Sequence, residues 1–229
     1  MLASLLLVLN GCSCNDSPFV INRVADEVEF SDLLLGYNYD HADKRSVEVT
    51  ISFAVRHLFF PSPDTVSMSC EVFQKWRDSR LKYAGAKSVT IPKDIKIWKP
   101  DTNFFESIAT YGAESLRLYA DGTICWKQQA TLTFPCISDF VFKQSDLSAL
   151  NCSLIIGSFD NSGAESIVYK VGDIMLPSNL NPSFATLAIN YTIATFEEVA
   201  LNGESMTQTV VHFFIESDQI FRSFNRTEL

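Results

Sequence analysis

The sequence has few of the residues on which most enzyme sites depend. Its 229 residues include only nine glycines and three histidines. So few glycines argue against a glycine-rich phosphate-binding loop, and no G-x-S-x-G or H-E-x-x-H motif accompanies His41, His57 or His212. Glu197 and Glu198 are adjacent in the chain and would point to opposite sides of a strand. We therefore predict that the protein is not an enzyme and has no catalytic residues.

The sequence also lacks the signals of a metal site, a nucleic-acid surface and a membrane span. Neither the C-x-x-C nor the C-x-x-x-x-H spacing of common zinc sites occurs, so we predict no metal and no cofactor. The formal net charge of −9 opposes binding to a phosphate backbone, so we predict no nucleic-acid partner. After the first residues, no apolar run approaches the length of about 18 residues that a spanning helix needs. We predict no membrane span in this chain, which by itself would not conduct ions.

The N-terminal residues are predicted to direct the chain to export. An apolar run at 2–9 is followed by small residues, which is typical of a secretory signal. We assign 1–14 to the signal and 15–229 to one mature domain, with a secreted, extracellular location. No basic residue precedes the run, and two alternatives stay open. The LNGC sequence at 9–12 also resembles a bacterial lipoprotein cleavage box, and the start is compatible with a ragged gene model.

Export has consequences for the cysteines and for four asparagines. An oxidising compartment favours disulfides over metal sites for cysteines at loop-closing distance. It also exposes N-x-S/T sequons to glycosylation. The sequence offers four candidate glycosylation sites: Asn15, Asn151, Asn190 and Asn225.

The distribution of apolar residues predicts an all-β fold. Eighteen Phe and seven Tyr favour strands over helices, and apolar and polar residues alternate along 47–56 and 66–76. One amphipathic helix is predicted at 24–40. Further strands are predicted at 88–91, 115–119, 124–134, 153–159, 183–196 and 207–224, with turns at 61–64, 120–122, 160–163 and 201–203. Many strands after one helix predict a single β-sandwich domain.

Several stretches, taken in order, carry a resemblance to a known family. FQKWRDSRLKY at 73–83 resembles a W-x-D-x-R-L signature, and IWKPDTNFFES at 97–107 matches a W-x-P-D-T motif. LLLGYNYD at 33–40 resembles the end of an N-terminal helix, and LRLYADGT at 116–123 matches a hairpin. With the cysteine loop described next, these stretches resemble the extracellular ligand-binding domain of the Cys-loop receptors, which are pentameric ligand-gated ion channels. They also resemble the soluble acetylcholine-binding proteins.

The resemblance implies an immunoglobulin-like twisted β-sandwich and a signature disulfide between Cys136 and Cys152. It also implies five protomers around an axis, with small-molecule sites between neighbours. The cysteine loop departs from the family, because it closes fifteen residues instead of thirteen, and Gln144 and Ser145 replace a Pro-aromatic pair. We expect a loop that is kept for its disulfide rather than for contact with a membrane domain.

On the principal face of each implied site, the resemblance places three phenylalanines. Phe105 falls where Tyr is common, Phe159 falls where Trp is common, and Phe196 begins the third ligand loop at 196–208. That loop lacks the adjacent cysteines and the tyrosines of nicotinic α-type receptors. Because these residues are missing, we do not expect nicotinic-type recognition of acetylcholine, and Phe also attracts cations less strongly than Trp or Tyr. The alternative role of Phe105 and Phe159 is packing between subunits.

On the complementary face, strand parity turns Glu71 and Phe73 away from the core, together with Cys125 and Lys127. The family's cage Trp would fall at Glu71, whose carboxylate would either attract an amine or pair with Lys127. A disulfide between Cys70 and Cys125 is a further alternative, which parity disfavours because Cys70 faces the core.

Three functions follow as hypotheses. The first is a secreted, soluble, homo- or hetero-pentameric protein that binds an amine or amino-acid transmitter. The second is the extracellular part of a truncated channel subunit, located at the extracellular face of the plasma membrane. The third is a structural sandwich module that has lost the ligand site.

Overall fold

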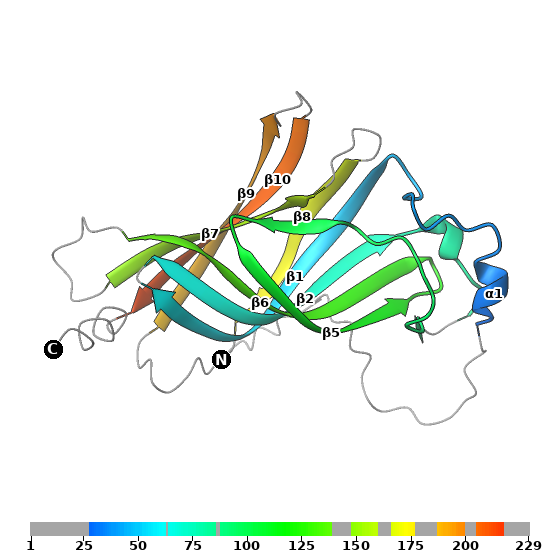
Figure 1. Cartoon of the computed structure of the whole chain (residues 1–229), viewed down its shortest axis with the longest axis horizontal. Coiled ribbons are helices and arrows are strands. Elements are labelled where there is room, and N and C mark those ends of the chain that lie inside the picture. Colours follow the sequence, from blue (N-terminus) through cyan, green and yellow to red (C-terminus); the bar gives the residue numbers. More distant parts are fainter. Residues whose placement is uncertain are drawn as a thin grey trace, which may run out of the picture.

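The computed structural model describes residues 28–62, 64–85, 88–138, 148–159, 166–176, 187–199 and 205–217. These residues form a short helix, one turn of 3-10 helix and ten strands (Figure 1). In chain order the elements are α1 (Phe30–Leu33), β1 (Ser46–Ser62), β2 (Thr65–Arg77), η1 (Ser79–Leu81), β3 (Val89–Thr90), β4 (Thr102–Phe105), β5 (Ile108–Leu118), β6 (Thr123–Ser138), β7 (Ser148–Ser158), β8 (Ser166–Met175), β9 (Leu187–Val199) and β10 (Ser205–Ser217).

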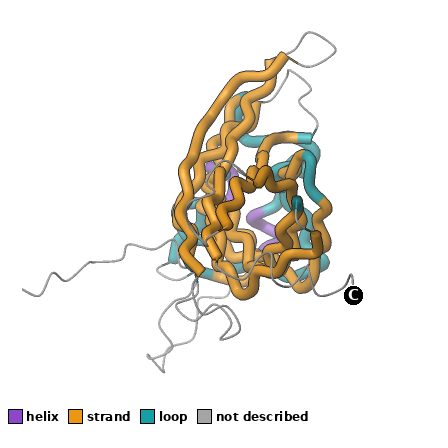
Figure 2. The backbone as a smooth tube through the Cα atoms, turned by 90° about the vertical axis from the view of Figure 1, so that its left-hand side faces the viewer, coloured by secondary structure: helices purple, strands orange, loops and turns teal. Residues whose placement is uncertain are grey.

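The strands form a sandwich from one continuous sheet. The main strand order is β8-β1-β2-β6-β7-β10-β9, while β3, β4 and β5 pair at the sides. Strand β6 belongs to both layers, because most of it pairs with β2 and β5 and its last residues pair with β7. The layers also touch directly, since the Thr209 hydroxyl on β10 donates to the Tyr169 carbonyl on β8 at 2.9 Å. Figure 2 shows the strands curving around the interior.

The alternation along the first two strands has the predicted effect. In β1 and β2, every second side chain points into the core, where it loses its contact with water and stabilises the fold. The buried residues that the pattern identified are Val47, Val49, Ile51, Phe53, Val55, Val66, Met68, Cys70, Val72 and Trp76. The prediction of an all-β sandwich is therefore confirmed.

The turn predicted at 61–64, of which residue 63 lies outside the described residues, is confirmed, and so is the turn predicted at 120–122. The β1–β2 hairpin closes with Ser62 opposite Thr65. The second turn joins β5 to β6 through Gly122, whose φ is +83°. A side chain at Gly122 would meet the Asp78 carbonyl at 2.3 Å, so glycine is required there. The turns predicted at 160–163 and 201–203 lie outside the described residues.

The predicted helix at 24–40 is mostly wrong in the described part of the chain. Only α1 is helical, and the preceding Glu29 has an extended backbone. Gly36 adopts a φ of +75° soon after the helix, which ends helical geometry. The apolar side chains of this segment instead pack onto the sandwich, where Phe30, Leu33 and Leu34 are partly buried. Residues 24–27 lie outside the described residues.

Two strands were not predicted, and several others, β5 among them, are longer than predicted. The two strands that were not predicted are β4, which has only four residues, and β8, in which Gly172 interrupts the alternation of apolar and polar residues. That glycine lies against β1, since a side chain there would meet the Ser52 hydroxyl at 2.6 Å. Strand β5 begins at Ile108 rather than 115, and an irregularity between Tyr111 and Glu114 obscures its alternation.

The segment after α1 is fixed to the sandwich through the W-x-D-x-R-L signature. Asp78 is buried, accepts a hydrogen bond from the Tyr37 hydroxyl at 2.8 Å and forms an ion pair with Arg80 at 2.7 Å. The Trp98 backbone N–H donates to the Tyr37 hydroxyl oxygen at 3.0 Å. The Trp98 and Trp76 rings meet edge to face, which joins both tryptophan motifs in one core.

Candidate ligand-binding site

The first half of the candidate site is built by pairing between β4 and β7. Thr102 lies opposite Ser158, and Phe105 lies opposite Ile155. The Ser158 hydroxyl donates to the Asp101 carboxylate at 2.7 Å, and the Phe159 N–H donates to the Asp101 carbonyl at 3.1 Å. Asp101 thus holds the end of β7 beside the start of β4, and these bonds fix where Phe159 emerges.

The two described phenylalanines of this half have different surroundings. Phe159 is 75% exposed. Phe105 is half-buried, and its ring covers Gly157, where an added Cβ would approach the ring to 2.8 Å. Phe105 lies opposite Ile155 of β7, four residues before Phe159, but its ring reaches Gly157, which is two residues before Phe159 and on the same face of the strand.

Phe196, the third predicted residue of this half, lies in β9 opposite Gln208 of β10. Its side chain lies outside the described part of the structure. Thr209, the residue after Gln208, lies opposite Ile156 of β7. Gln208 therefore faces Gly157, the residue that the Phe105 ring covers. Phe105 and Phe196 therefore belong to neighbouring rows of one layer.

The second half of the candidate site lies on the outward side of β1, β2 and β6, and the structure brings its four predicted residues together. Phe73 lies opposite Lys127, and the Lys127 ammonium is 5.4 Å from the centre of the Phe73 ring. The Glu71 carboxylate accepts a hydrogen bond from this ammonium at 3.1 Å. Phe73 and Cys125 are buried under the charges, in a small cluster with Ala54 that is separate from the main core.

Arg56 is the functional candidate that sequence reasoning missed. Its guanidinium donates to the other oxygen of the Glu71 carboxylate at 3.0 Å. In the sequence, Arg56 could be identified only as a polar residue of an alternating strand. The register of the β1–β2 hairpin, which sets Ala54 opposite Glu71, was the signal that could have identified it.

These three charged groups determine the electrostatics of the second half. Burial raises the pKa of Glu71, but hydrogen bonds from Lys127 and Arg56 outweigh that effect, and the net pKa lies below its ordinary value. Glu71 is therefore ionised at neutral pH. One carboxylate faces two cations, so the cluster of Arg56, Glu71 and Lys127 carries one net positive charge.

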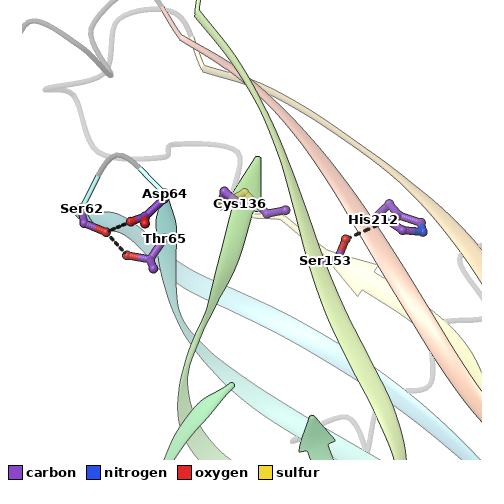
Figure 3. Close-up of a disulfide and its surroundings, with 7 residues drawn as sticks. Ser62, Asp64, Thr65, Cys136, Ser153 and His212 are labelled. Carbon is purple, nitrogen blue, oxygen red and sulfur yellow. Dashed lines mark hydrogen bonds between the residues drawn. A yellow bond between two sulfur atoms is a disulfide. The ribbon is translucent and has the colours of Figure 1, made fainter. Parts of the chain in front are cut away.

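The cysteines settle the two disulfide predictions. Cys136 and Cys152 are bonded, with their Cα atoms 3.9 Å apart, and they join β6 to β7 where the two layers meet (Figure 3). The Cys136 N–H donates to the Asp64 carbonyl at 2.7 Å, which places the β1–β2 hairpin beside the disulfide. Cys70 is a free, buried thiol, whereas Cys125 takes part in a disulfide. The alternative bridge between Cys70 and Cys125 is therefore wrong. Residues 139–147, which include Gln144 and Ser145, lie outside the described residues.

The remaining polar candidates have ordinary surroundings. His57 is exposed, and His212 lies on β10 with its Nδ1 3.0 Å from the Ser153 hydroxyl (Figure 3). Across the described residues, no group of three or more His, Cys, Asp or Glu side chains is placed to hold a metal ion. No helix in the described ranges has the length and apolar character needed to cross a membrane.

Comparison with known proteins gives one family and several relatives. Residues 27–212 match the family described as the neurotransmitter-gated ion-channel ligand binding domain. The chain is 24% identical over 155 residues to the gamma-aminobutyric acid receptor alpha-like protein of Drosophila melanogaster, an alignment that covers 64% of this chain and 21% of the relative. It is 25% identical over 149 residues to the gamma-aminobutyric acid receptor subunit pi of Bos taurus, covering 59% of this chain and 34% of the relative. The matched part thus spans about a fifth to a third of these relatives.

Proposed function

Because the chain belongs to the family of neurotransmitter-gated ion-channel ligand-binding domains, we propose that it binds a small amino-acid transmitter between the subunits of an extracellular pentamer. In this proposal the protein is secreted and soluble, like the acetylcholine-binding proteins. Phe105, Phe159 and Phe196 of one protomer face Arg56, Glu71 and Lys127 of the next. Phe73 and Cys125 support the charged groups from below.

The observation that carries the choice of ligand is the composition of the charged cluster. Glu71 is already held by Lys127 at 3.1 Å and by Arg56 at 3.0 Å, so an amine would have to compete with two cations for it. A ligand carboxylate would instead meet the one positive charge that Glu71 leaves uncompensated. At about 4 Å such an attraction is worth roughly 4 kcal/mol near a protein surface, before desolvation is subtracted. The cluster therefore favours a ligand that carries a carboxylate.

The aromatic half suits the other end of the same ligand. An amino-acid transmitter has an ammonium group, which phenyl rings attract through their faces by about 0.5–2 kcal/mol. Phe159 is exposed and available for such a contact. An amine without a carboxylate would gain only this weaker interaction. The names of the two relatives, both gamma-aminobutyric acid receptors, agree with a ligand that has both groups.

Ligand binding to the purified protein tests the proposal. Gamma-aminobutyric acid or glycine should raise the midpoint of thermal unfolding, and choline, which has no carboxylate, should raise it much less. Lys127→Met should abolish most of the shift. Lys170→Met is the matched control, because Lys170 also pairs with a glutamate, Glu48 at 2.5 Å, on neighbouring strands outside the cluster. If none of these ligands protects a protein that still assembles, the third hypothesis, a structural module without a ligand site, replaces this one.

A second candidate function is the extracellular part of a channel subunit at the plasma membrane. It is favoured by the relatives, which are about three to five times longer than the matched part. Transcripts that continue past Leu229 and encode four apolar membrane spans would support this candidate and contradict the secreted form. The ligand experiment applies equally to both.

A further inference from the structure

Two N-x-S/T sequons lie on described strands, and their surroundings differ. Asn190 lies in β9, the last strand of the sheet order, and is exposed. Thr192, the hydroxyl residue of its sequon, is also exposed and points to the same side of the strand. The neighbouring residues along 191–195 are exposed as well, and none of the described strands pairs with β9 on its outer edge, so a bulky group on Asn190 would meet no described strand there.

Asn151 lies within the sheet instead. It stands in β7 with Ile137 of β6 on one side and Phe214 of β10 on the other. Its Oδ1 atom is buried without a hydrogen-bond partner. The Ser153 hydroxyl of its sequon is 3.0 Å from His212, and the middle residue, Cys152, is bonded to Cys136. A folded chain has little room for a glycan at this position.

The surface beside Asn190 also suits a sugar. Phe214 lies directly opposite Asn190 on the neighbouring strand and is 40% exposed. Side chains in such opposite pairs have Cβ atoms about 4.5–5.5 Å apart, within reach of the first sugar of a glycan. The apolar row continues through Asn151 to Ile137, which is 72% exposed. Phe214 therefore exposes apolar surface to water beside β9, the last strand of the described sheet, and a sugar on Asn190 would cover this surface.

We propose that Asn190 carries an N-linked glycan whose first N-acetylglucosamine packs on Phe214, and that Asn151 remains unmodified. The modification requires the export that the proposed function assumes. In the transfer, the Asn190 Nδ2 atom bonds to C1 of the first sugar of a lipid-pyrophosphate-linked oligosaccharide. The bond from C1 to the phosphate oxygen breaks, the lipid pyrophosphate leaves, and the amide nitrogen loses one proton. Phe196 is six residues along β9, roughly 20 Å in extended chain, so the glycan leaves the candidate ligand site open.

The test expresses the full chain in insect cells in two forms, one with its own N-terminus and one with a heterologous signal sequence ahead of Met1. Peptide N-glycosidase F in ¹⁸O water, followed by peptide mass mapping, identifies each occupied asparagine. Asn190 should be labelled. Asn190→Gln and Thr192→Ala should each lose the mass of one glycan, while Asn151→Gln should retain the wild-type mass.

A second readout tests the packing on Phe214. Enzymatic removal of the glycan should lower the midpoint of thermal unfolding by about 1–2 °C in the wild type and leave that of Phe214→Ser unchanged. Failure of export from the chain's own N-terminus alone contradicts the secreted function. An unlabelled Asn190, or a labelled Asn151, in the form with the heterologous signal overturns the glycan proposal.

Discussion

Asp78 is the charged side chain that fixes the N-terminal segment to the sandwich. It is buried, and its carboxylate depends on Arg80 and the Tyr37 hydroxyl for compensation. The guanidinium also lies 4.3 Å from the centre of the Tyr37 ring and donates to the Asn38 and His41 carbonyls. Burial raises the pKa of the Tyr37 hydroxyl, so it stays protonated and serves Asp78 as a donor.

Arg80→Ala should lower the free energy of unfolding by about 3 kcal/mol, because it leaves the buried Asp78 carboxylate without its cation. Urea unfolding of both proteins measures the difference. Arg77→Ala is the matched control, since Arg77 is an exposed arginine of the same motif that donates to the Asp121 carbonyl at 3.2 Å, and its loss should cost below about 1 kcal/mol. Equal losses in the two variants would contradict the role assigned to Arg80.

Glu71 gives a pH dependence whose sign follows from its lowered pKa. A carboxylate with a folded-state pKa below the unfolded value stabilises the fold fully above the unfolded value, about 4.3 for Glu. This contribution is lost as the pH falls through the folded-state pKa. The difference in unfolding midpoint between the wild type and Glu71→Gln should therefore shrink as the pH falls from about 5 toward 3. A difference that stays constant over this range would show that the carboxylate charge contributes nothing.

At the scale of elements, β6 and β7 carry the connection between the two layers. Their pairing is short, from Cys136 opposite Cys152 to Ser138 opposite Leu150, and the disulfide reinforces its first step. Both cysteines are buried in the main core. The bond also closes the cysteine loop that the resemblance to the receptor family implied.

Replacing Cys136 and Cys152 together by alanine should lower the free energy of unfolding by about 3 kcal/mol, the chain-entropy value for a loop of about 15 residues. Chemical unfolding under non-reducing conditions measures it. The control is Cys70→Ala, which removes a buried thiol without breaking a bond and should cost roughly 1 kcal/mol. A loss in the double variant no larger than in this control would mean that the loop closure does not stabilise the fold.

At the scale of the whole molecule, the candidate site is incomplete in one protomer. The phenylalanines and the charged cluster lie on different layers, and each half is open to water at Phe159 or Arg56. A second copy that brings the opposite half completes the site in the proposed pentamer. Oligomeric state is therefore a direct test of the ligand proposal.

The protein should sediment with about five times the mass of its mature chain, which is slightly below the 25.7 kDa of all 229 residues. Analytical ultracentrifugation after enzymatic removal of glycans gives this mass without a contribution from sugars. A monomer across the concentrations used for ligand binding would contradict an inter-subunit site, whichever ligand is tested.

Sequence reasoning succeeded where a local pattern has one structural solution. The alternation at 47–56 and 66–76 identified the core faces of β1 and β2 and turned Glu71 and Phe73 away from the core. It failed where packing overrides the local pattern. The apolar spacing at 24–40 predicted a long helix, yet α1 is short because its side chains pack onto the sandwich beside a left-handed Gly36. Strand β8 was missed because Gly172 breaks its pattern to fit against Ser52.

The sequence by itself determined the all-β class, the faces of the long strands and the family motifs, since these depend on spacing along one strand or one turn. Only the tertiary structure decided that Cys70 is free, that Phe105 covers Gly157, and that Arg56 joins Glu71 and Lys127. Those contacts join strands through register and sheet curvature, which arise from the packing of the whole sandwich. The charge balance of the candidate site depends on them, and with it the choice between an amine and an amino acid.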